Sequence, residues 1–168
     1  VYTKGQSGSI QSGEKLGNLA LEKTDAITKL GIPGTVFQLL DKDGMVLSVI
    51  QQENGYRLPT QDDLDDGIQT ITTMETSQNG EILLDGIPYG SYSLVETQAA
   101  AGYVSDTTPI AFTIGDKDFT EQADGSFLPI TKTLNKTNTP TRVTVTKTDK
   151  VTSEPLPGAA LAIYQKAD

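Results

Sequence analysis

The sequence predicts an all-β protein, and three observations carry that prediction. Apolar residues alternate with polar ones over short runs, as in residues 19–25 and 110–114. Turn dipeptides such as Asp43-Gly44 and Asn79-Gly80 separate these runs. No long run shows the 3.6-residue apolar spacing of an amphipathic helix. With 168 residues, the chain has room for one ordinary domain and part of another.

The predicted strands and turns follow one another along the chain. Strands are expected at residues 19–25, 35–40, 45–50, 68–73, 81–85, 92–96, 110–114 and 128–138. Turns are expected at residues 32–34, 41–44, 79–80 and 88–90, and a polar hairpin at 116–126. Residues 1–18 are rich in Gly and Ser and are predicted to be a linker or the end of a preceding domain.

Between residues 51 and 78 the alternation weakens, and this stretch is predicted to be a surface excursion. It contains an acidic cluster, Asp62, Asp63, Asp65 and Asp66. Solvated charge explains such a cluster without any ligand. Calcium binding or contact with a ligand is the alternative interpretation.

Composition excludes several classes of function. The chain has no His, Cys or Trp, which removes Ser-His-Asp and Cys-His nucleophiles, thiolate zinc sites and disulfides. The net charge of −9 and the pI of about 4.4 argue against a nucleic-acid partner. No apolar run reaches membrane-spanning length and no signal peptide is evident. Because the chain starts at Val1, we expect a fragment of a longer protein.

Three polar residues occupy the apolar phase of their strands. Lys23 follows Leu19 and Leu21, Glu96 follows Tyr92 and Leu94, and Asn138 keeps the phase of Ile130 and Leu134. A lysine at such a position either packs its stem while its amine reaches water, or is buried and reactive. Burial favours the neutral amine and the neutral carboxylic acid. A neutral lysine amine beside an asparagine carboxamide can attack its Cγ, with the glutamic acid transferring protons, and the product is a Lys–Asn isopeptide bond.

The chain also contains an internal repeat. Residues 19–44 align without gaps with residues 143–168, so that Lys23 corresponds to Lys147. Further identical pairs include Thr24/Thr148, Asp25/Asp149, Thr28/Thr152, Pro33/Pro157 and Gly34/Gly158. We expect a tandem array in which residues 141–168 form the first two strands of a second, truncated domain. That second copy lacks counterparts of Glu96 and Asn138, so Lys147 is expected to remain unbonded.

The sequence resembles the CnaB/SpaA-type isopeptide domains of Gram-positive pilins and adhesins. The matching stretches are Leu-Glu-Lys-Thr-Asp at 21–25, Pro-Gly-Thr-Val-Phe-Gln-Leu at 33–39, and Gly-Ser-Tyr-Ser-Leu-Val-Glu-Thr at 90–97, followed by Gly102-Tyr103. Where the family usually has Ala-Pro-x-Gly-Tyr, this chain has Ala-Ala-Ala-Gly-Tyr. The resemblance covers residues 19–140 and restarts at residue 143.

This resemblance implies an Ig-like, prealbumin-like β-sandwich. It implies that Lys23 is the nucleophile, Glu96 the catalytic acid and base, and Asn138 the acceptor. Asn135 is the alternative acceptor, although it needs a bulge to face the core. Neither a cofactor nor a metal is expected, and the bond forms once per molecule, so the chain is not an enzyme with turnover.

The resemblance further implies a stalk or pilin-like module on the cell wall of a Gram-positive bacterium. Neighbouring domains of the array are its expected partners, with sortase-linked pilin subunits or host matrix proteins as further candidates. Val1-Tyr2-Thr3-Lys4 resembles the Val-Tyr-Pro-Lys motif whose lysine accepts the neighbouring pilin subunit, which makes Lys4 a candidate acceptor. The rival hypothesis is an adhesin domain that contacts a host ligand through residues 51–78.

Overall fold

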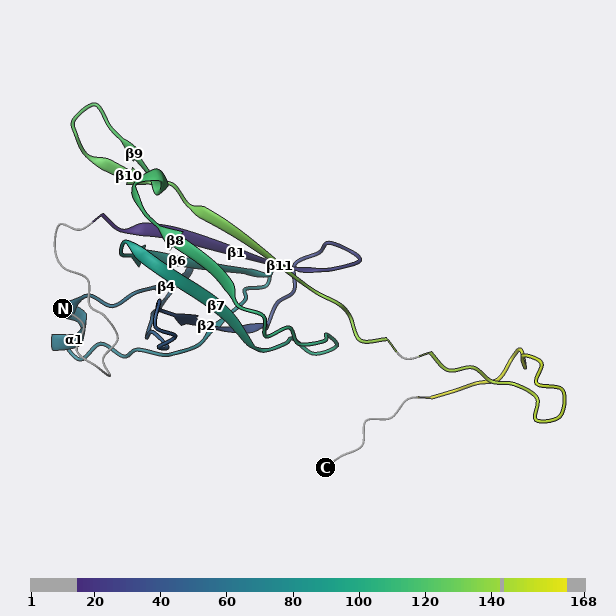
Figure 1. The fold of residues 1–168 in the computed structure, drawn as a ribbon. Coiled ribbons are helices and arrows are strands. Elements are labelled where there is room, and N and C mark those ends of the chain that lie inside the picture. The colour runs from purple at the N-terminus through teal and green to yellow at the C-terminus, as the bar shows by residue number, and fades with distance from the viewer. Residues whose placement is uncertain (1–14, 143, 163–168) are drawn as a thin grey trace.

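The computed structural model describes residues 15–142 and 144–162. Two sheets lie face to face and form a β-sandwich, which confirms the predicted fold class (Figure 1). One sheet has the strand order β11-β1-β6-β4-β3 and the other the order β5-β2-β7-β8. A hairpin of β9 and β10 extends from one end of the sandwich (Figure 1).

The elements are short, as expected for a sandwich with frequent turns. The first sheet consists of β1 (Gly17–Asp25), β3 (Ile50–Gln52), β4 (Gly55–Arg57), β6 (Glu81–Ile87) and β11 (Lys132–Asn138). The second sheet consists of β2 (Val36–Leu40), β5 (Met74–Glu75), β7 (Gly90–Gln98) and β8 (Ile110–Ile114). The remaining elements are the helix α1 (Gln61–Asp65), the 3-10 turn η1 (Asp116–Asp118) and the hairpin strands β9 (Phe119–Glu121) and β10 (Phe127–Pro129).

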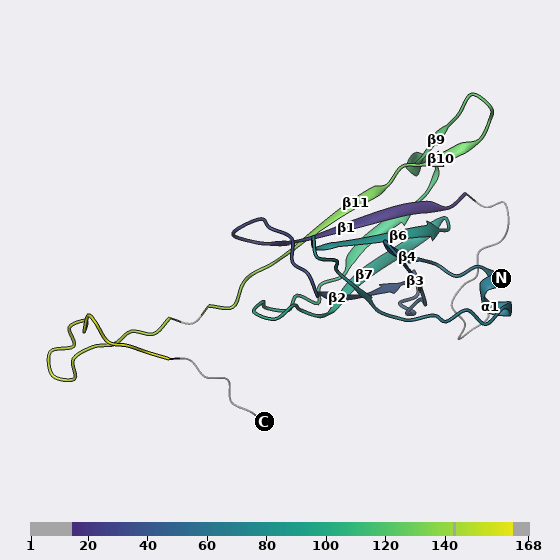
Figure 2. The ribbon, with the colours of Figure 1, turned by 180° about the vertical axis from the view of Figure 1, so that it is seen from behind.

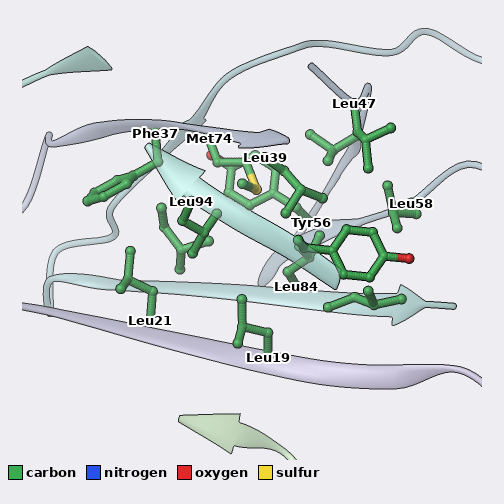
Figure 3. Packing of buried hydrophobic residues seen from close by; sticks show 14 of the residues in the cluster. Leu19, Leu21, Phe37, Leu39, Leu47, Tyr56, Leu58, Met74, Leu84 and Leu94 are labelled. Atoms are coloured by element: carbon green, nitrogen blue, oxygen red, sulfur yellow. The ribbon is translucent and has the colours of Figure 1, made fainter. Parts of the chain in front are cut away.

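The core lies between the two sheets and is built from the alternating apolar residues (Figure 3). β1 contributes Leu19 and Leu21, β2 contributes Phe37 and Leu39, and β7 contributes Leu94, all of which are almost completely buried. Each such side chain stabilises the fold by about 1.5–3 kcal/mol relative to an exposed one. The period-2 pattern therefore fixes which face of each strand points inward.

The first and last strands of the domain are neighbours and run in the same direction. β1 pairs with β11 in parallel and with β6 in antiparallel orientation. Within the parallel pair, Lys23 lies opposite Lys136 and Asp25 opposite Asn138. The chain consequently enters β1 at one end of the sandwich and leaves β11 at the other (Figures 1 and 2).

Predicted strand boundaries are wrong at both ends of the domain. The single strand expected at 128–138 divides into β10, which pairs with β9, and β11, which pairs with β1. Pro129 has no N–H to continue a ladder, and the backbone N–H of Ile130 donates to Asp118 instead. Ile130 is 50% exposed and therefore does not share the buried phase of Asn138. At the other end, β1 starts at Gly17, inside the segment predicted to be a linker.

The region 51–78 is more ordered than the sequence predicts. The strand expected at 68–73 is wrong, because Ile71 forms only an isolated bridge with Val49 and the ladder starts at β5. The strand expected at 45–50 likewise reduces to a bridge between Val46 and Leu40 before β3. The acidic cluster lies on α1 and beside it, where Asp63 caps the helix together with Thr60.

Residues 144–162 extend away from the sandwich (Figures 1 and 2). Their local hydrogen bonds repeat those of the first lysine-bearing turn. The N–H of Ile32 donates to the carbonyl of Lys23, and the N–H of Leu156 donates to that of Lys147, at 2.8 and 2.9 Å. The two predicted strands are reduced here to an isolated bridge between Thr148 and Pro155. Val143 and Ile163, predicted for these strands, lie outside the described residues.

Candidate functional site

The three polar residues singled out in the sequence meet in the core. Lys23 comes from β1, Glu96 from β7 and Asn138 from β11. Lys23 and Glu96 have no exposed surface, and Asn138 is 2% exposed. Each residue lies on the inward face of its strand, so the alternation that buries the leucines buries these side chains as well.

Glu96 bridges the other two residues with its two carboxylate oxygens. Its Oε1 accepts a hydrogen bond from Asn138 Nδ2 at 2.8 Å, while its Oε2 lies 3.6 Å from Lys23 Nζ. The backbone N–H of Asp106 also donates to Oε1, at 3.2 Å. One carboxylate therefore contacts both the amine and the carboxamide.

The hydrogen bonding of this group is incomplete. Within residues 15–142 and 144–162, four buried side-chain polar atoms lack a hydrogen-bond partner. Three of them belong to this site: Lys23 Nζ, Glu96 Oε2 and Asn138 Oδ1. Buried polar atoms are nearly always paired, because an unpaired one costs about 1–3 kcal/mol. Their concentration at one point suggests a role other than stability.

Burial sets the protonation of the amine. Desolvation lowers the pKa of Lys23 below its ordinary value of 10.5, although the attraction of Glu96 opposes this effect. The positive charge of Lys136 lowers the pKa of Lys23 further, while Asp106 raises it. The net effect lowers the pKa of Lys23, so that the nucleophilic neutral amine forms more readily than in an exposed lysine.

The other predicted site residues lie elsewhere. Asn135 is exposed on the opposite face of β11, in register with Glu22. Lys147 is exposed in the segment after the sandwich. Lys4 lies outside the described residues. Of the two candidate acceptors, only Asn138 is buried and bonded to the carboxylate that contacts the amine.

Sequence reasoning missed two charged residues beside the site. Lys136 is 7% exposed, donates from Nζ to the carbonyl of Thr108 at 2.6 Å and lies 3.3 Å from Asp106 Oδ2. Its place at the inward phase of β11, two residues before Asn138, was the available signal. No such signal marks Asp106, because it acts on Glu96 through its backbone N–H from a loop.

A further set of hydrogen bonds holds the end of β1, two residues after Lys23. Asp25, the last residue of β1, accepts hydrogen bonds from the backbone N–H groups of Ile27 and Thr28 and from the hydroxyl of Tyr103. These bonds lower the pKa of Asp25. Tyr103 belongs to the Gly-Tyr pair of the sequence motif, so the motif ties the 102–108 segment to the lysine-bearing strand.

The acidic cluster forms no metal site. Within the described ranges, no group of three or more His, Cys, Asp or Glu is arranged to share a metal ion. Asp63 instead binds Arg57 through both carboxylate oxygens, which holds the pKa of Asp63 well below its usual range. Among the same residues, no helix is long and apolar enough to cross a membrane.

The geometry defines a class of protein: a prealbumin-like β-sandwich with a buried lysine, carboxylate and carboxamide in its core. A family model described as the SpaA prealbumin-like fold domain matches residues 17–126. The chain belongs to this family. A search of curated protein sequences gives no significant match.

Several solved structures with a similar fold are described as pilins. BcpA, the major pilin subunit of Bacillus cereus, is 27% identical in sequence with a TM-score of 0.50, over 74% of this chain and 29% of that one. GBS52, the minor pilin of Streptococcus agalactiae, has a TM-score of 0.56 at 23% identity, over 80% of this chain and 48% of that one. The shaft pilin SpaA from Lactobacillus rhamnosus GG has a TM-score of 0.52 at 20% identity, over 79% and 50%. The chain thus spans at most half the length of these three pilins.

Proposed function

We propose that the chain is a structural stalk module of a Gram-positive cell-wall surface protein, locked by a bond between Lys23 and Asn138. The observation that carries the proposal is the buried contact of one carboxylate with both an amine and a carboxamide. Family membership and the pilin fold support the structural role.

The proposed reaction needs only these three side chains. In the reactive form the amine of Lys23 and the carboxylic acid of Glu96 are both neutral, and the amine attacks Cγ of Asn138. Glu96 gives its proton to the amide nitrogen, which leaves as ammonia, and takes one proton back from the attacking nitrogen. One N–C bond forms, one C–N bond breaks, and Glu96 ends in its starting protonation state. The ion pair and the neutral amine–acid pair hold the same number of protons, so the reactive form arises without exchange with solvent.

The bond would lie on the path of tension through the domain. Force enters through β1 and leaves through β11, which are adjacent and parallel. A covalent link between these strands would carry the load in place of their hydrogen bonds. It closes a loop of about 115 residues, which stabilises the fold by on the order of 4–5 kcal/mol in chain-entropy models.

The repeated turn supports an array of such modules. Residues 141–168 are proposed to begin a second domain, in which Lys147 takes the position of Lys23. Neighbouring domains are then the first partners of this chain, and Lys4 is a candidate for linkage to another subunit.

Force spectroscopy tests the mechanical role. In a chain pulled from its two ends, the residues between Lys23 and Asn138 should release no length if the bond is present. The Glu96→Gln chain should release about 400 Å from the same residues when it unfolds. Equal extension from both proteins would refute the proposal.

A further inference from the structure

A second buried lysine lies directly beside the proposed reaction centre. Lys136 is the register partner of Lys23 in the parallel pair of β1 and β11, and its side chain is 6% exposed. Its amine does not approach Glu96 in the way that Lys23 does. It is held by the carboxylate of Asp106 and by the carbonyl of Thr108.

Asp106 contacts both Lys136 and Glu96. Its side chain pairs with Lys136 at 3.3 Å, and its backbone N–H donates to Glu96 Oε1 at 3.2 Å. The Asp106 Oδ1 atom also accepts the N–H of Thr108 at 3.0 Å, which closes a local turn. Any displacement of this turn moves a hydrogen-bond donor away from the proposed catalytic carboxylate.

The surrounding segment is anchored at its other end. The N–H of Val104 donates to the carbonyl of Thr139, and the N–H of Thr141 donates to that of Gly102, at 3.0 and 2.7 Å. These bonds fix residues 102–104 to the chain just after Asn138. The ion pair with Lys136 then fixes residues 106–108 to β11.

We infer that Asp106 and Lys136 form a positioning pair that holds the carboxylate of Glu96 in place for the proposed reaction. The inference rests on the proposed function and adds residues that act through Glu96 rather than on the reacting atoms. Removing either partner frees the turn at residue 106, and bond formation slows by about fivefold.

The two partners have opposite electrostatic effects, which distinguishes this role from simple packing. The charged groups that act on Lys23 are Glu96 on β7, Lys136 on β11 and Asp106 on the loop. Removing the positive charge of Lys136 raises the pKa of Lys23, whereas removing the negative charge of Asp106 lowers it. The pH range of bond formation therefore shifts upward in Lys136→Met and downward in Asp106→Asn.

The test follows ammonia loss after folding begins. Each chain is translated in a cell-free system, quenched in urea and diluted into buffers from about pH 5 to about pH 10, with intact mass recorded over time. Lys132→Met is the matched control, because Lys132 lies on the same strand and pairs with the largely buried Asp118. We expect slower reaction with opposite pH shifts in Asp106→Asn and Lys136→Met, and a profile like that of the unmutated chain in Lys132→Met.

A second measurement, amide hydrogen exchange, does not require the bond between Lys23 and Asn138. In the Asn138→Ala chain, the amide hydrogen of Asp106 should be protected from exchange by Glu96, and adding Lys136→Met should remove at least half of that protection. Absence of the bond in the unmutated chain would refute the proposed function. The exchange of the Asp106 amide would then still test whether Asp106 and Lys136 hold Glu96 in place. Unchanged exchange at Asp106, or pH shifts in the same direction for both variants, would overturn the inference.

Discussion

At the scale of single residues, the site is defined by Glu96 and by the burial around it. Its two oxygens contact different partners, the amine of Lys23 and the amide nitrogen of Asn138. An isolated buried ion pair is a poor source of stability, because desolvation offsets the Coulomb attraction. The reaction proposed above uses both contacts.

Replacing Glu96 with glutamine separates proton transfer from packing. Glu96→Gln keeps the shape and an oxygen that can accept from Asp106, but it cannot take up and return a proton. We expect this chain to fold, to keep its full sequence mass, and to melt lower by on the order of 15 °C because it lacks the cross-link. Calorimetry and intact mass measure both effects, and bond formation at the normal rate would remove Glu96 from the mechanism.

The lowered pKa of Lys23 predicts a pH dependence in the unbonded protein. In Asn138→Ala, the unfolded chain binds more protons than the folded chain between the lowered pKa and about 10.5. The free energy of unfolding therefore gains a contribution that rises with pH across this interval. In the bonded protein Lys23 is an amide and does not titrate.

Urea unfolding of both proteins, from about pH 7 to about pH 10, checks this prediction. Groups common to the two proteins cancel in the comparison. The stability gap between bonded and unbonded protein should narrow as the pH rises. A gap that stays constant or widens would show that burial does not lower the pKa of Lys23.

At the scale of elements, the turn before β6 holds the lysine-bearing part of β1 in place. Gly80 has φ +79°, and a Cβ there would lie 2.5 Å from the carbonyl oxygen of Lys23. The N–H of Lys23 donates to the carbonyl of Gly80 at 2.8 Å. Gly44 has nearly the same φ, +78°, but a Cβ there would meet no atom within 4 Å.

This pair of glycines gives a matched test. Gly44→Ala should cost about 1–2 kcal/mol, because alanine is strained at positive φ. Gly80→Ala should cost a further 1–3 kcal/mol, roughly, because the backbone of β1 must shift, and it should slow bond formation at Lys23. Urea unfolding in the Asn138→Ala background measures the loss of folding free energy for both alanine variants without the cross-link. Equal costs at the two positions would contradict the close approach.

Strand phase was the reliable part of the sequence prediction. It identified Lys23, Glu96 and Asn138 as inward-facing, since a strand with one buried face fixes the direction of every side chain. It missed Lys136, because a lysine in an apparently polar strand looks solvated. It also joined β10 to β11, although Pro129 could have indicated the break. Asp106 could not be predicted, since tertiary contacts alone bring its backbone to Glu96.

At the scale of the whole molecule, the segment after the sandwich differs from the domain in its packing. Val145 is 58% exposed and Leu161 62% exposed, whereas Leu19 and Leu21 are buried. Two short strands are marginally stable alone in water. In dilute protein we therefore expect rapid amide exchange over residues 144–162 and strong protection over 19–21 and 92–96. Strong protection of residues 144–148 in a proven monomer would contradict the prediction, because it would show that this segment packs against the domain.

The central claim is a covalent bond between Lys23 and Asn138, and the mass of the folded chain tests it most directly. We predict a mass one ammonia below that of the sequence, and a cross-linked peptide pair after digestion that contains Lys23 and Asn138. A correctly folded protein with its full sequence mass would contradict the account. A cross-link from Lys23 to Asn135 would retain the bond but refute the assigned acceptor.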